Sequence, residues 1–136
     1  MVEINDLRKF DTFSLFSEDQ LAEIAKITEK QTFKKGAQIY QEGDRANHIF
    51  LVTRGLVSMR KIAPGDTIGI SFESREKGDL FGTACFMKPQ EYTLNSVCLE
   101  DSEVMAIDAD KLFELFQNYP EIGTFFDRES DNLKGD

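Results

Sequence analysis

Seven glycines divide the middle of the chain into short segments, and their spacing restricts the fold more than any other feature. They are Gly36, Gly43, Gly55, Gly65, Gly69, Gly78 and Gly82. The runs between them have the length and composition of strands, a pattern typical of a compact antiparallel barrel or jelly roll. The expected strands are Ala37–Gln41, His48–Thr53, Leu56–Ala63, Asp66–Ser74, Tyr92–Leu99 and Ser102–Asp108, with a shorter one near Asp79–Phe81.

Helical patterns flank this β-rich region on both sides. Ser17 is a good N-cap with Gln20 three residues later, and apolar residues follow at helical spacing. Asp108 or Asp110 can cap a second helical segment that ends before Pro120, and a last short segment with a polar tail follows. We therefore expect a mainly β fold with flanking α-helices in one domain over 1–136: helices in 1–30, a β-roll in 31–108 and helices in 109–130.

The charge balance disfavours some partners. The chain has 25 acidic residues against 16 lysines and arginines, a formal charge of −9, so its surface repels polyanions and we expect no nucleic-acid binding. No apolar run approaches the roughly 18 residues that span a bilayer, and the N-terminus lacks the pattern of a signal peptide, so a cytoplasmic protein without membrane contact is predicted. Cys85 and Cys98 lie beside apolar residues and are expected to be buried thiols.

No residues are spaced like a catalytic or metal site. The single histidine, His48, begins an expected strand and has no adjacent cluster of Cys, Ser or carboxylate side chains. Glu42 and Asp44 fall in an expected turn, where charge usually serves solvation. We therefore predict neither an enzyme nor a bound metal.

One segment has a more specific pattern. Gly36, the aliphatic Ile39, the pair Gly43-Asp44 and a strand that ends in Gly55 follow one another in order. This spacing resembles the opening of cyclic-nucleotide-binding domains of the catabolite-activator-like type. The likeness extends from about Leu15 to Pro120 and implies a double-stranded β-helix, or jelly roll, with helices before and after it.

A second motif fits the same family. Gly78-Asp79-Leu80-Phe81-Gly82 resembles the entry to its phosphate-binding cassette, and residues 83–87 would form the short helix that follows. In such a cassette, glycine lets the backbone approach a phosphate, and helix amides donate to its oxygens. The resemblance implies these ligand-binding residues: Phe81, Gly82, Thr83, Ala84, Cys85, Lys88, Tyr92 and Thr93.

The cassette departs from the family pattern at two positions. Thr83 stands where the family has a glutamate that binds the ribose hydroxyl. The family also has an arginine that pairs with the cyclic phosphate; Tyr92 falls at about that position here, and Thr93 matches the Ser or Thr that follows the arginine. Losing that arginine should weaken a cyclic nucleotide by about one to two powers of ten. Lys88 could supply the charge and Tyr92 could stack a base or donate its hydroxyl. Alternatively, Lys88 is a solvated loop residue and Tyr92 packs in the fold.

Two functions remain open at this stage. The chain is either a regulatory sensor of a cyclic nucleotide or another small anion, or an interaction module whose pocket has degenerated and which binds a second copy or a separate protein. Phe113, Phe116, Phe125 and Phe126 would serve such an interface, or they pack against the roll. About sixteen residues follow Pro120, too few for a helix-turn-helix domain, so any output is expected to pass through a partner or self-association.

Overall fold

The computed structural model describes residues 2–61 and 70–133 and contains two four-stranded antiparallel sheets with helices at one end. The elements are α1 (Ile4–Arg8), η1 (Asp11–Phe13), α2 (Glu18–Lys26), β1 (Thr28–Phe33), β2 (Gln38–Tyr40), β3 (His48–Arg54), β4 (Leu56–Lys61), β5 (Ile70–Glu76), β6 (Leu80–Phe81), η2 (Thr83–Phe86), β7 (Asn95–Cys98), β8 (Ser102–Asp108), α3 (Ala109–Asn118) and α4 (Pro120–Leu133). The predicted jelly-roll fold with flanking helices is confirmed.

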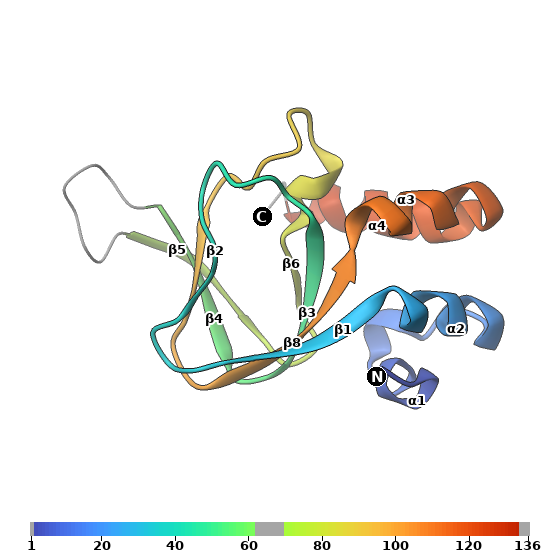
Figure 1. Cartoon of the computed structure of the whole chain (residues 1–136), viewed down its shortest axis with the longest axis horizontal. Helices are drawn as coiled ribbons and strands as arrows, with labels where there is room; N and C mark the ends of the chain where they lie inside the picture. Colours follow the sequence, from blue (N-terminus) through green and yellow to red (C-terminus); the bar gives the residue numbers. More distant parts are fainter. Residues whose placement is uncertain (1, 62–69, 134–136) are drawn as a thin grey trace.

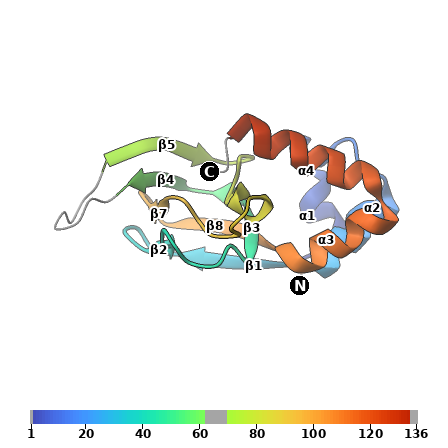
Figure 2. The ribbon, with the colours of Figure 1, turned by 90° about the horizontal axis from the view of Figure 1, so that it is seen from above.

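The two sheets face each other across the core. One has the strand order β1-β8-β3-β6 and the other β2-β7-β4-β5 (Figure 1). Among the described strands, only β4 and β5 are neighbours both in sequence and in one sheet; every other consecutive pair crosses from one sheet to the other, as in a jelly roll. Seen from above, all four α-helices lie at one end of the roll (Figure 2).

The first helical region is shorter than predicted. Ser17 and Gln20 form the expected capping box, with each side chain accepting a hydrogen bond from the other residue's backbone N–H. Helix α2 nevertheless ends at Lys26, and Thr28 already begins β1, so the boundary at residue 30 is corrected. The reason is tertiary, because all six residues of β1 pair with β8.

The C-terminal helices differ from the prediction in length. Asp108 caps α3, and its carboxylate accepts a hydrogen bond from the Lys111 amide at 3.0 Å. Helix α4 does not end at residue 130 but continues to Leu133, whose side chain packs against the core. Leu133 lies seven residues, about two helical turns, after Phe126, and its contact with the core accounts for the longer helix.

Several predicted strands keep their position but change their ends. The strand expected from Tyr92 begins at Asn95, and the strand expected from Asp66 is described from Ile70 and continues to Glu76. Its predicted start, and the predicted end of β4 at Ala63, lie outside the described residues. Within residues 2–61 and 70–133, no helix has the length and apolar character needed to cross a bilayer.

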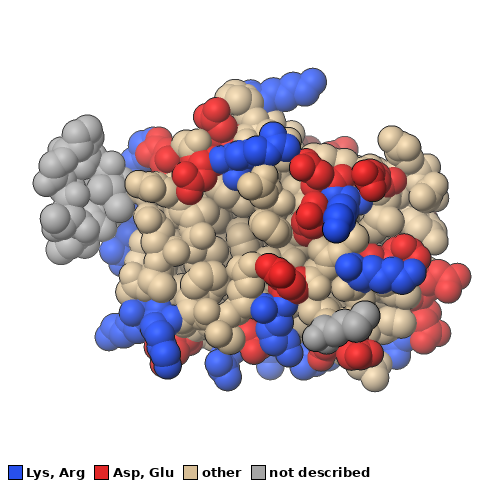
Figure 3. All heavy atoms as spheres, in the orientation of Figure 1, with Lys and Arg blue, Asp and Glu red and all other residues tan. Residues whose placement is uncertain are grey.

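The surface mixes both charges unevenly. On the face drawn in Figure 3, acidic and basic side chains alternate over the upper part of the molecule, whereas lysines and arginines predominate along the left and middle of its lower edge. The net charge of −9 therefore does not make every surface acidic.

Candidate functional site

The predicted cassette forms a tight turn followed by a short helix. Strand β6 leads into Gly82, which has a left-handed backbone with φ of 82°, and Thr83 begins the 3-10 helix η2. A Cβ atom on Gly82 would lie 3.1 Å from Cδ2 of Phe50 and 3.3 Å from the carbonyl oxygen of His48. Glycine is needed here both for its φ and because the turn lies against β3.

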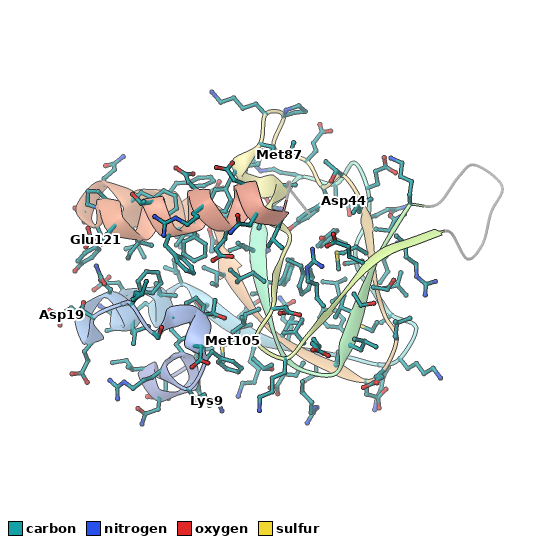
Figure 4. All side chains as sticks on the ribbon, turned by 180° about the vertical axis from the view of Figure 1, so that it is seen from behind. Lys9, Asp19, Asp44, Met87, Met105 and Glu121 are labelled. Atoms are coloured by element: carbon teal, nitrogen blue, oxygen red, sulfur yellow. The ribbon has the colours of Figure 1, made fainter. Side chains whose placement is uncertain are left out.

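The eight candidate residues divide into a buried and an exposed group. Phe81, Gly82, Thr83, Ala84, Cys85 and Tyr92 are buried, whereas Lys88 and Thr93 are exposed. Figure 4 shows Met87, at the end of η2, on the outside of the roll beside the C-terminal helices. The turn therefore lies inside the fold while the end of the cassette faces solvent.

Tyr92 is committed to contacts within the protein. Its ring lies parallel to that of Tyr40, with 3.7 Å between the centroids and 7° between the planes. Its hydroxyl donates to the carbonyl oxygen of His48 at 2.8 Å and accepts from the His48 amide at 3.2 Å. Only 5% of the Tyr92 surface is exposed. In this structure its ring is stacked on Tyr40, and its hydroxyl is hydrogen-bonded to the backbone of His48 both as donor and as acceptor.

Two more aromatic side chains, Phe50 and Phe81, continue this layer between the sheets. Phe50 and Phe81 stack with 4.9 Å between ring centroids, and Tyr40 lies 5.8 Å from Phe50. The Tyr40 hydroxyl also contacts the sulfur of Met59 at 3.5 Å. The space beside the cassette turn is thus filled by the protein's own side chains, drawn from β2, β3, β4 and β6.

The loop before β3 holds the cassette loop by its backbone. Gly43 N–H donates to the Tyr92 carbonyl, and Tyr92 N–H donates to that of Asp44, both at 2.9 Å. Ala46 N–H donates to the carbonyl oxygen of Gln90 at 3.0 Å, and the Gln90 side chain donates back to Ala46 at 2.9 Å. The Gly-Asp pair of the first motif therefore supports the second motif, a role that sequence spacing did not reveal.

Arg75 is a buried cation beside the cassette that was not predicted from the sequence. It is 6% exposed; its Nε atom donates to the Leu80 carbonyl at 3.2 Å and its guanidinium pairs with Glu73. A buried arginine requires such partners, since an unpaired buried charge is very costly. Arg75 thus fastens β5 to the strand that enters the cassette.

Two cavities border the cassette loop. One, of about 430 Å³, opens beside the Tyr40–Tyr92 stack and is lined by Gln31, Ile39, Tyr40, Asp44, Arg45, Asn47, His48, Phe50 and Tyr92. The other, of about 340 Å³, lies between η2 and the C-terminal helices and is lined by Cys85, Phe86, Met87, Lys88, Gln90, Phe113, Phe116 and Asp127. The predicted residues Lys88 and Tyr92 therefore belong to different cavities.

Burial raises the pKa values of three titratable groups in and near the cassette. Desolvation raises the pKa of the Cys85 thiol to about 12, partly opposed by its own backbone amide. Desolvation likewise raises the pKa values of Tyr92 and Cys98 above their usual range. Both cysteines are buried free thiols, as expected, and no cluster of potential metal ligands occurs among the residues that the structure describes.

Comparison with known proteins agrees with this geometry. The family model of the cyclic nucleotide-binding domain matches residues 30–119. The anaerobic regulatory protein of Bacillus subtilis is 30% identical over 106 residues, which cover 76% of this chain and 44% of that protein. A Drosophila melanogaster cGMP-dependent protein kinase, isozyme 1, is 26% identical over 121 residues, 88% of this chain and 16% of the kinase.

Solved structures show the same fold. A Geobacter metallireducens GS-15 protein assigned to the cyclic nucleotide-binding class superposes with a TM-score of 0.83 at 24% identity, covering 97% of this chain and 95% of that one. The regulatory domain of Toxoplasma gondii PKA, crystallised with cAMP, has a TM-score of 0.78 at 17% identity over 96% of this chain and 48% of that one.

The fold and the cassette turn define a regulatory β-roll domain. Because the family model covers most of its length, the chain belongs to the cyclic nucleotide-binding domain family. It spans less than half the length of the curated relatives named above.

Proposed function

We propose that this chain is a regulatory domain that acts through protein contact, and that its roll does not hold a cyclic nucleotide in the manner of the family's cassette. The observation that carries the proposal is the stack of Tyr92 on Tyr40, with the Tyr92 hydroxyl bonded to the backbone of His48. A nucleotide that entered beside Gly82 would have to displace these rings.

The side chains of the cassette support the same proposal. Thr83 has no exposed surface and is shorter than the glutamate of the family pattern. Lys88 is exposed and lines the cavity of about 340 Å³ between η2 and the C-terminal helices, called the outer cavity below. In this structure it therefore does not replace the missing arginine inside the roll. The interior therefore offers a cyclic phosphate backbone amides, and the buried cation at the entry to the cassette, Arg75, is already paired with Glu73 and bonded to the Leu80 carbonyl.

The outer cavity is the surface that fits a protein contact. Phe86 packs against Phe113 and Phe116, and Met87 beside them keeps 41% of its surface exposed. Lys88 and Asp127 also line this cavity, and neither forms an ion pair within the described part of the chain. A two-fold interface can pair the Lys88 of one copy with the Asp127 of the other around an apolar centre, so we take the partner to be a second copy.

Phe125 and Phe126 serve the interior rather than this surface. Phe126 has no exposed surface, and both rings pack on Phe16 from the N-terminal region. Among the phenylalanines considered for an interface, Phe113 and Phe116 alone line the outer cavity.

The exposed methionine provides the test. Met87→Glu is expected to weaken self-association by at least about tenfold in sedimentation experiments, because a charge would be buried at the centre of the contact. The matched control is Leu15→Glu, since Leu15 is 83% exposed and belongs to the connection between η1 and α2. A protein that is monomeric at every concentration, or a dimer broken by Leu15→Glu instead, would contradict the proposed interface.

A second candidate is a sensor of a different small molecule. It is favoured by the cavity of about 430 Å³ that opens beside Tyr40 and Tyr92, with Asp44 and His48 among its lining residues. A ligand there would contact the aromatic stack from outside and leave it in place, which distinguishes this candidate from a cyclic-nucleotide sensor of the family type.

A further inference from the structure

Three lysines from distant parts of the chain line one small cavity. Lys9 is the C-cap residue that follows α1, Lys30 lies in β1, and Lys77 lies in the turn between β5 and β6. The cavity measures about 180 Å³ and is also lined by Phe10, Thr53, Glu103 and Met105. Figure 4 shows Lys9 and Met105 close together where the N-terminal helices meet the sheet.

The cavity has an excess of positive charge in an acidic protein. None of the three lysines forms an ion pair with a carboxylate in residues 2–61 and 70–133; the one contact recorded is Lys9 over the Phe10 ring at 6.0 Å. The carboxylate of Glu103 accepts a hydrogen bond from the Thr53 hydroxyl at 2.7 Å. Three ammonium groups against one carboxylate leave a formal charge of +2, within a chain whose net charge is −9.

We infer that this cavity binds a phosphate group, either as inorganic phosphate or as a small phosphate monoester. All three lysines are exposed and line this cavity, so their flexible side chains can bring ammonium groups to a dianion held there, which would accept charge-assisted hydrogen bonds from them. The volume of about 180 Å³ has room for a tetrahedral oxyanion with its nearest waters. The site is separate from the cassette and does not depend on the proposed function.

Its position would connect the N-terminal helices to the cassette. Lys77 immediately precedes Gly78, and the Gly78 carbonyl accepts a hydrogen bond of 2.8 Å from the Thr12 hydroxyl in η1. A phosphate held by Lys9 and Lys77 would add a second link between the same two segments. Binding is therefore expected to protect the amides of α1 and of the β5–β6 turn from hydrogen exchange.

The test is a titration of the ¹⁵N-labelled chain with inorganic phosphate, at ionic strength held constant with chloride. We expect saturable shifts of the Lys9, Lys30 and Lys77 amides with a dissociation constant of about 1 mM. The double variant Lys30→Gln/Lys77→Gln should weaken binding by about tenfold or more, and Lys111→Gln, an exposed lysine outside the cavity, should not. Circular dichroism checks that the variants remain folded.

The outcomes separate specific binding from screening. Shifts that chloride reproduces, that never saturate, or that Lys111→Gln reduces as much as the double variant does would overturn the inference. Titration with glycerol phosphate distinguishes the two sources. Equal or tighter binding indicates a phosphate monoester, and clearly weaker binding indicates free phosphate, because the glycerol moiety then clashes with the cavity.

Discussion

Replacing Tyr92 by alanine is expected to lower the free energy of unfolding by about 3–5 kcal/mol, which is typical of losing a buried aromatic side chain. The change removes the stack on Tyr40 and leaves the N–H and C=O of His48 without the Tyr92 hydroxyl. Equilibrium unfolding in urea measures the loss.

A milder variant separates the contribution of the Tyr92 ring to stability from that of its hydroxyl. Tyr92→Phe keeps the stack and removes the two hydrogen bonds, so we expect a loss of about 1–3 kcal/mol from the unmade bonds of His48. Tyr119, which is only partly buried, provides the control, and Tyr119→Phe should change stability by less than about 0.5 kcal/mol. Equal stabilities of the wild type and Tyr92→Phe would show that the hydroxyl does not fasten the cassette loop to β3.

Replacing Gly55 by alanine is the second substitution with a large expected effect. Gly55 connects β3 to β4 with φ of 94°, and an added Cβ would lie 2.6 Å from the carbonyl oxygen of Asp101. Left-handed strain and overpacking cost about 1–3 kcal/mol each, so a loss of roughly 2–6 kcal/mol is expected.

Gly36→Ala is the matched control for Gly55→Ala. Its φ is 88°, but no atom lies within 4 Å of the added Cβ, so only the cost of backbone strain, about 1–3 kcal/mol, is expected. The difference between the two variants in urea unfolding then measures the steric term. Equal losses would show that the turn between β3 and β4 can move away from Asp101.

The sequence predicted the elements that carry strong local signals. Ser17 and Gln20 have side chains that can cap a helix whatever follows them, and the glycine at position 82 marked the cassette turn correctly. Strand β1 was missed because Thr28–Phe33 is mostly polar and has no apolar alternation; its pairing with β8 determines its conformation. The conformation of β1 therefore depends on residues 102–107, which are far away in the sequence.

The sequence predicted the turn at Gly82 but not the residues that surround it. The motif led to Gly82 and Tyr92, yet their surroundings depend on residues far away in the chain. Tyr40 meets Tyr92 because β2 pairs with β7 and because the Gly43-Asp44 loop binds the cassette loop. The filled interior could therefore be recognised only once the two sheets were in place.

Isothermal titration with cyclic AMP and cyclic GMP tests the central claim most directly. If Tyr40 and Tyr92 occupy the interior, as proposed, neither nucleotide should give saturable heat, and any dissociation constant should be weaker than about 1 mM. Binding of one nucleotide per chain at micromolar concentration, lost when Gly82 is replaced by a bulky residue, would contradict the account. The aromatic stack would then have to open, and the chain would be a cyclic-nucleotide sensor of the family type.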